Sequence, residues 1–301
     1  MRKGKRFTPA LLEKWQREGR GQGLLQHYQP WHQVTRSDPG SRGRSHLINW
    51  RLGRLHHLLS DQELVAFCFS VMQPNLYDLR EQYALSLYED AAELSVVDGR
   101  HRKPVIGTLA LAKNLGIRHP VVRKDGVTEP WVMSTDLVLT LRKASGGVEL
   151  LAVSVKSSDE LDNARKLDLL RIERLYWVQQ GVPWLLLTPD LFSKEVAINL
   201  RYSMPWAVDA TPFSDACLEQ VGVVFRQRAG ESSASVLSAV SRHFSFVLQD
   251  AQRALWQAVW SGRVTLDLGS ALRPNSGLNV LTPEAFWAQN PIVSRRSAWQ
   301  F

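Results

Sequence analysis

The chain has 301 residues and a net charge of +8, with 44% hydrophobic and 22% charged residues. This composition is typical of globular proteins and the length suffices for two domains, so a disordered or fibrous protein is excluded. Only two cysteines occur, Cys68 and Cys217, and both have apolar neighbours. A disulfide framework and a cysteine zinc site are therefore excluded, and we expect both thiols to be inert core residues.

No targeting or membrane segment is expected. The N-terminus lacks the apolar core of a signal peptide, and the longest apolar stretch, roughly residues 64–72, is far shorter than the ~18 residues needed to span a bilayer. We therefore expect a soluble, cytoplasmic protein.

The basic charge is concentrated near the N-terminus. Residues 1–54 contain 12 Lys or Arg against 3 Asp or Glu, a net charge of +9, which leaves −1 for the rest of the chain. Such a segment favours a polyanion partner, because Lys and Arg contacts to phosphates release condensed counterions. A basic tail that is merely solvated is the alternative. The candidate DNA contacts are Arg2, Lys3, Lys5, Arg6, Arg42 and Arg44.

In chain order, PALLEKWQREG has a short helical pattern and SDPGSRGRSH predicts a loop. Ser60, followed three residues later by Glu63, is a capping-box pattern that predicts an apolar helix over about residues 60–73. Residues 78–87 alternate like a strand. After a segment punctuated by Gly and Pro through about residue 128, residues 131–142 and 149–156 predict two antiparallel strands joined by a hairpin loop.

A long amphipathic segment then predicts a helix that ends at Gly181, and VPWLLLT predicts a buried strand. Beyond Thr188, helical patterns precede two predicted short strands around a Pro-Asn-Ser-Gly turn, an order that is typical of a winged-helix module. The chain thus divides into four parts. They are a basic N-terminal arm (1–45), an α/β domain (46–190), a mostly helical winged-helix-like domain (191–282) and an aromatic C-terminal tail (283–301).

Three residues of the α/β domain carry the candidate chemistry. Asp136 interrupts an apolar strand, where an ionised carboxylate is costly unless a cation compensates it, and Lys156 ends the next strand. If the hairpin pairs these strands, the two side chains can approach each other near the first turn of the Glu63 helix. Two carboxylates and a lysine suit metal-dependent phosphodiester cleavage, because the carboxylates hold Mg²⁺ and the ammonium stabilises charge that builds up on phosphorus.

Each of these residues also has a structural alternative. Glu63 can serve only the capping box, Asp136 can cap a turn or pair with an arginine, and Lys156 can extend its charge to solvent from a strand end. His56 and His57 are adjacent, so in an extended segment they point opposite ways and are poor joint metal ligands.

Seven segments, in this order, resemble the TnsA family, the endonuclease subunits of heteromeric cut-and-paste transposases of bacterial transposons. They span roughly residues 15–200. The segments are GRSH (43–46), GRLHHLLSDQE (53–63), DLREQY (78–83), GIRHPV (116–121), VMSTD (132–136), SVK (154–156) and KLDLLRIERLYWVQQGVPW (166–184).

The resemblance implies a restriction-endonuclease-like (PD-(D/E)XK) catalytic domain of the α/β class. It places the family's catalytic glutamate on Glu63, its metal-binding aspartate on Asp136 and its catalytic lysine on Lys156. It also implies Mg²⁺, two ions per active site with Mn²⁺ as a substitute, bound by Glu63 and Asp136. Similar nucleases usually carry a carboxylate or amide ligand two positions before the lysine. This sequence has Ser154 there, and a hydroxyl is a weak ligand for Mg²⁺, so the carbonyl of Val155 or a water held by Ser154 is expected to complete the metal shell.

The resemblance further implies that the enzyme cuts the 5′ ends of a transposon, while a DDE transposase cuts and joins the 3′ ends. An AAA+ ATPase regulator is expected to engage the C-terminal region. There the tail aromatics Phe286, Trp287, Trp299 and Phe301 either dock on this partner or pack back on their own domain. Two alternatives to the transposase nuclease are a non-catalytic DNA-binding adaptor, which Ser154 favours, and a stand-alone restriction or repair nuclease.

Overall fold

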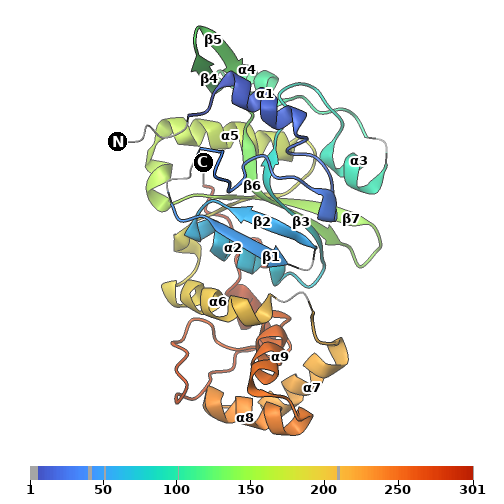
Figure 1. Ribbon diagram of the computed structural model, residues 1–301, viewed down its shortest axis with the longest axis vertical. Coiled ribbons are helices and arrows are strands. Elements are labelled where there is room, and N and C mark those ends of the chain that lie inside the picture. The colour runs from blue at the N-terminus through green and yellow to red at the C-terminus, as the bar shows by residue number, and fades with distance from the viewer. Residues whose placement is uncertain (1–5, 40–42, 51, 101, 209–210, 301) are drawn as a thin grey trace.

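The computed structural model describes residues 6–39, 43–50, 52–100, 102–208 and 211–300. A four-stranded sheet lies at its centre and consists of β3 (Leu76–Ala84), β6 (Ser134–Arg142), β7 (Val148–Val155) and β8 (Trp184–Leu187). The strand order is β3-β6-β7-β8, and Figure 1 labels the first three of these strands. The β3–β6 and β6–β7 pairs are antiparallel, and β8 runs parallel to β7.

One helix covers each face of the sheet. Alternate strand residues such as Leu139 and Leu151 belong to the apolar cluster that contains α2 (Asp61–Val71), below the sheet in Figure 1. The intervening residues, such as Val138 and Ala152, belong to the cluster that contains α5 (Ala164–Val178), above it. Side chains of a strand alternate between faces, so Asp136, two residues before Val138, lies on the α5 face.

The predicted order of helix, three strands, helix and strand is confirmed, although β3 ends three residues earlier than expected. The predicted Gly/Pro-rich segment contains two short helices and a small antiparallel hairpin, and a second hairpin precedes α2. The sequence patterns did not predict either hairpin. These elements are α3 (Glu93–Asp98), α4 (Thr108–Asn114), β4 (Val121–Lys124) with β5 (Val127–Pro130), and β1 (His46–Trp50) with β2 (Arg54–Leu58).

The described part of the predicted basic arm packs on the sheet domain instead of extending freely. Its helix α1 (Pro9–Arg17) begins at Thr8, whose hydroxyl accepts a hydrogen bond from the Leu11 amide. Trp15 and Trp31 are buried and meet edge to face. The amide of Trp31 also donates to the carbonyl of Gln82 on β3. The charge of this segment predicted an extended basic arm. Burial of its aromatic side chains instead holds the described part of the segment against the sheet domain.

The C-terminal part is helical, and its helix α9 packs against three others. These are α6 (Lys194–Ala207), α7 (Asp215–Arg226) and α8 (Ser233–Phe244), around α9 (Leu248–Trp260). Its buried side chains form one continuous cluster with those of α2 and the adjoining sheet face, so the two parts share a core. In the described residues after β8, the predicted wing is reduced to single bridges, one of them Leu266–Val280. A winged-helix module is not confirmed.

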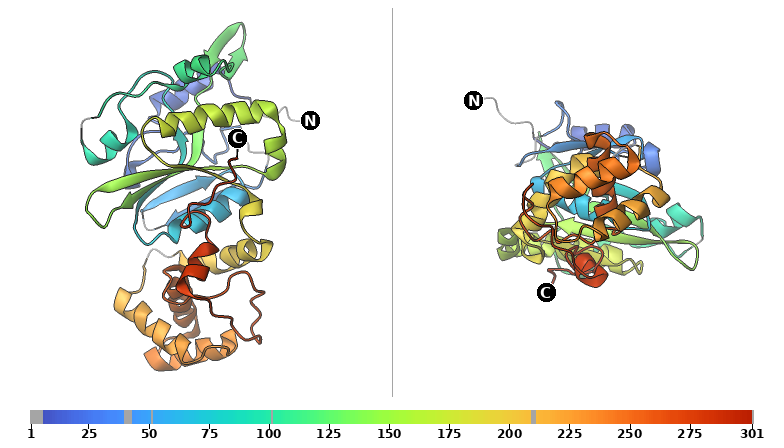
Figure 2. Two further views of the ribbon diagram at one scale, coloured as in Figure 1. Left: turned by 180° about the vertical axis from the view of Figure 1, so that it is seen from behind. Right: turned by 90° about the horizontal axis from the view of Figure 1, so that it is seen from below.

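The chain end returns to the sheet domain. After α10 (Pro283–Ala288), the side-chain amide of Asn290 donates to the carbonyl of Phe69, and Ile292 is fully buried. The Ala298 amide donates to the carbonyl of Leu186 on β8, and this segment crosses the back of the sheet (Figure 2). Of the two alternatives for the tail, packing on the protein's own fold is the one that the structure shows for residues 290–300. Phe301 lies outside the described residues. The part of the chain that the structure describes contains no helix long and apolar enough to cross a bilayer.

Candidate active site

The predicted approach of Asp136 and Lys156 is confirmed by the β6–β7 pairing. Oδ2 of Asp136 accepts hydrogen bonds from Nζ of Lys156 at 2.7 Å and from the amide of Val155 at 2.6 Å. Lys156 also donates to the carbonyl of Val155 at 2.8 Å. Burial disfavours the charged ammonium, but Asp136, followed by Glu173, outweighs it and raises the pKa of Lys156. The lysine is therefore a stable cation.

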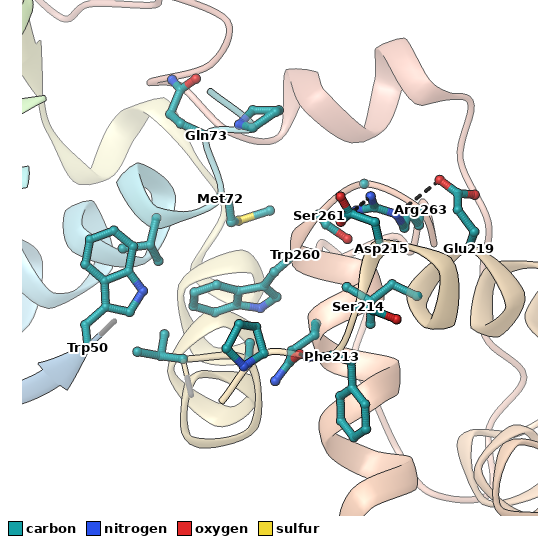
Figure 3. A pocket seen from close by; sticks show the side chains of 18 of the residues that line it. Trp50, Met72, Gln73, Phe213, Ser214, Asp215, Glu219, Trp260, Ser261 and Arg263 are labelled. Atoms are coloured by element: carbon teal, nitrogen blue, oxygen red, sulfur yellow. Dashed lines mark hydrogen bonds and ion pairs between the residues drawn. The ribbon is translucent and has the colours of Figure 1, made fainter. Parts of the chain in front are cut away.

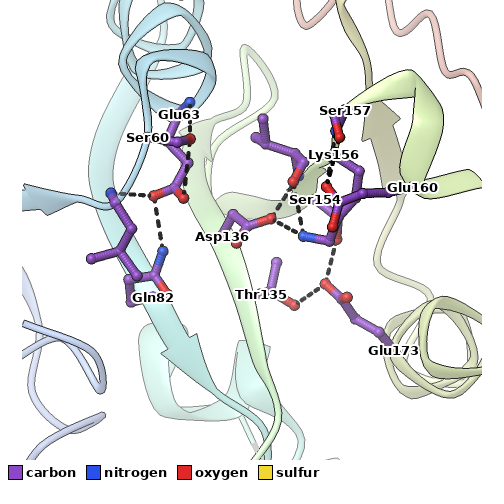
Figure 4. Close-up of polar contacts among 12 residues, drawn as sticks. Ser60, Glu63, Gln82, Thr135, Asp136, Ser154, Lys156, Ser157, Glu160 and Glu173 are labelled. Atoms are coloured by element: carbon purple, nitrogen blue, oxygen red, sulfur yellow. Dashed lines mark hydrogen bonds and ion pairs between the residues drawn. The ribbon is translucent and has the colours of Figure 1, made fainter. Parts of the chain in front are cut away.

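Glu63 stands at the first turn of α2, on the other side of Asp136 from Lys156 (Figure 4). The Ser60 hydroxyl caps the Glu63 amide at 3.1 Å, as the sequence pattern predicted. The Glu63 carboxylate, however, accepts from the amide of Leu59 at 2.8 Å instead of closing the capping box on Ser60. Burial, followed by the negative charge of Asp136, raises the pKa of Glu63 to about 8. The charge of Lys156 offsets this shift only in part, and no ion pair joins the Glu63 carboxyl group among the described residues.

Gln82 is a site residue that the sequence analysis missed. Its side-chain amide donates to the Glu63 carboxylate at 3.0 Å. It lies on β3 between the paired positions Glu81–Leu137 and Tyr83–Thr135, and its φ is +49°. A non-glycine residue with a left-handed backbone inside a strand is strained, and such strain is common at functional sites. The motif DLREQY contains this residue, but no pattern in it indicates the unusual backbone.

Glu173 is the second missed residue. Although it comes from α5, it is buried beside the strands, where Oε1 accepts from the Thr135 hydroxyl at 2.7 Å and from the Ser154 hydroxyl. Burial raises its pKa, while the positive charge of Lys156 acts in the opposite direction. In the sequence Glu173 is one of several charged residues of an amphipathic helix. Only the knowledge that its side of the helix faces β7 would have distinguished it from the others.

The hydroxyl group of Ser154 is already hydrogen-bonded within the protein. It is fully buried, donates to Glu173 and accepts from the indole of Trp184 at 3.0 Å. The hydroxyl group is thus used inside the protein. A larger side chain at this position would have to displace Trp184 or Glu173, which contact the Ser154 hydroxyl.

A cavity of about 300 Å³ opens beside Asp136 and Lys156 and also reaches Trp131, Lys166 and Glu173. In the described residues, no group of three or more His, Cys, Asp or Glu side chains is arranged as a metal site. The oxygen donors at the site are nonetheless of the kind that Mg²⁺ prefers, with waters completing its shell. A bound cation would lower the pKa of Glu63 towards its ordinary value, because it would compensate the buried negative charge. Glu63, Asp136 and the Val155 carbonyl therefore fit a Mg²⁺ site.

The remaining predicted residues either do not line this cavity or are not among the residues that the structure describes. Arg6 and Arg44 are exposed, whereas Arg2, Lys3, Lys5 and Arg42 lie outside the described residues. His56 bonds to the buried Glu81, and His57 accepts from the amide of Val34, so the two histidines point apart as expected.

A larger groove, about 980 Å³, separates the end of α2 from the helical part (Figure 3). Trp50, Phe213 and Trp260 line it, and Arg263 pairs with Asp215 and Glu219 at one side. The side-chain amides of Gln73 and Gln257 also line it. Both are buried, and their nitrogens have no hydrogen-bond partner among the described residues.

A carboxylate and a lysine at the ends of adjacent antiparallel strands, with a glutamate from the preceding helix, define a restriction-endonuclease-like nuclease core. Residues 74–189 match the family model described as TnsA-like endonuclease N terminal. The chain is also similar to the Transposon Tn7 transposition protein TnsA of Escherichia coli, with 34% identity over 197 residues. That match covers 65% of this chain and 63% of the relative, so it spans less than two thirds of the relative's length. Residues 74–189 are thus similar to the N-terminal domain of TnsA-like endonucleases.

Proposed function

We propose that the protein is a metal-dependent DNA endonuclease that cuts the 5′ ends of a transposon as one subunit of a bacterial, cytoplasmic transposase. A DDE transposase subunit cuts and joins the 3′ ends, and an AAA+ ATPase regulates the complex. The observation that carries this proposal is the Asp136–Lys156 pair, with Glu63 near enough for the charge of Asp136 to raise its pKa.

Each side chain has a role that follows from its position. Glu63 and Asp136, with the Val155 carbonyl, would hold Mg²⁺ or Mn²⁺, two ions per site. When bound, the metal polarises the phosphate and lowers the pKa of the attacking water. Lys156 is held protonated beside Asp136, where its ammonium stabilises the negative charge that develops on the phosphate oxygens. Gln82 and the Leu59 amide orient the Glu63 carboxylate.

Nicking of DNA that carries the ends of the protein's own element tests this function, with and without the DDE subunit. The Asp136→Asn variant should lose 5′ cutting while the partner still cuts the 3′ ends, so that joined products remain attached at their 5′ ends. Asp125→Asn, at an exposed turn, is the matched control. Normal excision by the Asp136 variant would contradict the nuclease assignment. Absence of 5′ cutting by the wild type would favour an adaptor, and nicking without the partner would favour a stand-alone nuclease.

A further inference from the structure

A second cavity, about 360 Å³, adjoins the active site and is not used by the chemistry described above. Four rings define this aromatic pocket: Phe7, Trp15, His32 and Trp131. His32 stacks on Trp131 with ring centroids 5.5 Å apart and planes at 29°, and Phe7 meets Trp131 edge to face at 4.7 Å. The pocket is large enough for a small organic ligand.

The aromatic pocket is connected to the catalytic residues. Trp131 and Ser134 line both this pocket and the cavity of Asp136 and Lys156. Leu59 and Gln82 also line it, and both hold the Glu63 carboxylate. A group seated against the rings is therefore separated from the cavity of Asp136 and Lys156 only by Trp131 and Ser134.

The pocket has a polar group without a partner. His32 is half-buried, and its ring makes aromatic contacts but no hydrogen bond to any described residue. Burial lowers the pKa of His32 to about 4, so the imidazole is neutral at pH 7 and offers one donor and one acceptor. Flat apolar walls with such a group at the edge match the face and edge of a nucleobase.

The catalytic residues are also recessed. The side chain of Asp136 is 13% exposed and Glu63 is 7% exposed. A phosphate of a regular duplex is flanked by its stacked bases, so it reaches such a recess only if the local backbone leaves its regular path. Enzymes that act on a base move its nucleotide out of the stack and hold the base in a pocket. The same movement would let a strand enter this recess.

We propose that the aromatic pocket receives the base next to the scissile phosphate, turned out of the duplex when the strand enters the active site. This inference rests on the proposed nuclease function and adds a binding site to it. Stacking on the rings offsets the loss of stacking in the duplex, and the stacking of one base on aromatic side chains is worth about 5- to 150-fold in affinity.

The test combines a protein change with a DNA change. Wild type and His32→Ala are titrated, with Ca²⁺ in place of Mg²⁺, against duplexes of the element's end that carry one abasic nucleotide at successive positions. His32→Ala should weaken binding of the intact duplex about tenfold. When the missing base is the one next to the cut, the abasic duplex should bind His32→Ala and the wild type equally well. His32→Phe keeps an aromatic ring but has no polar group, so it should lose less affinity for intact DNA than His32→Ala does. His243→Ala, exposed on α8, is the control.

The outcomes separate this inference from the nuclease function. Equal losses for His32→Ala on intact and abasic DNA at every position would overturn the pocket, even if the protein cuts DNA normally. In another outcome, the wild type binds as proposed, with the effect of His32→Ala disappearing at one abasic position, and still does not cut DNA with Mg²⁺ and its partner subunit. That result would support the base-binding pocket and refute the nuclease function. No binding to any of the duplexes would refute both. Circular dichroism of each variant verifies that an observed loss does not come from unfolding.

Discussion

The raised pKa of Glu63 makes a specific prediction about stability. The ordinary pKa of a glutamate is 4.5, and the folded protein raises the pKa of Glu63 to about 8. Below pH 4.5 both the folded and the unfolded chain carry the proton. Between pH 4.5 and 8 only the folded protein keeps it, so the unfolded state binds fewer protons and stability falls as the pH rises. Above pH 8 both states are ionised and the loss is complete.

The size of the effect follows from the shift. One pKa unit corresponds to about 1.4 kcal/mol, so the shift sets a ceiling of about 5 kcal/mol on the loss. Local relaxation and water entry reduce this, and we expect about 1–3 kcal/mol. Glu63→Gln removes the ionisation, and its carbonyl oxygen can still accept from the Leu59 amide. The variant should therefore be more stable than the wild type by an amount that grows from pH 5 to pH 8.

Urea unfolding of both proteins in EDTA, at pH values from 5 to 8, measures this difference. Added Mg²⁺ should reduce it, since binding to the folded wild type at 100 times the dissociation constant contributes about 2.7 kcal/mol. Glu129→Gln, at an exposed position of β5, reports the effect of removing a solvated carboxylate. A Glu63→Gln difference that does not change between pH 5 and 8 would refute the burial argument. A wild type unaffected by Mg²⁺ would refute Glu63 as a ligand.

Three further predictions concern the surroundings of the site. Ser154→Gln should lower stability by about 1–3 kcal/mol in urea unfolding, because it overpacks the space between Glu173 and Trp184; an unchanged midpoint would show that this space can expand. Removing residues 290–301 should cost at least about 3 kcal/mol, since the burial of Ile292 and the Asn290–Phe69 bond are lost; a truncated protein of full stability would make the tail dispensable for the fold. Neutralising Arg2, Lys3, Lys5 and Arg6 should weaken end and non-end DNA equally and lower the slope of log affinity against log salt by about 0.9 for each lost contact, whereas an unchanged slope would leave this stretch without a role in binding.

The sequence predicts the approach of Asp136 and Lys156 because local rules determine it. A glycine-containing loop between two apolar strands makes them antiparallel neighbours, so a carboxylate on one and a lysine at the end of the other can meet. Glu63 is predictable for a similar reason, since the Ser60 cap fixes the start of α2. Both inferences need only residues that are close in sequence or joined by one turn.

Gln82 and Glu173 are not predictable in this way, because each acts across elements distant in the chain. Gln82 reaches Glu63 from β3 with a left-handed backbone that its neighbours along the chain do not indicate. Burial of Trp15 and Trp31 is equally non-local, since it depends on the β4–β5 hairpin and β3. Charge dominates the pattern of the N-terminal segment, and apolar burial of a few large rings determines its structure.

The surroundings of Ser154 show how a departure at one position can be compensated by another. The residues Asp136, Ser154 and Lys156 lie on the α5 face of the sheet. A small side chain at Ser154 therefore leaves room for a group from that helix. Glu173 fills this room and accepts the serine hydroxyl, so a carboxyl group stands directly behind the position where similar nucleases have a ligand. Its charge also helps to keep Lys156 protonated. Because the departure at Ser154 is accompanied by this carboxyl group, it does not by itself favour the non-catalytic adaptor over the nuclease.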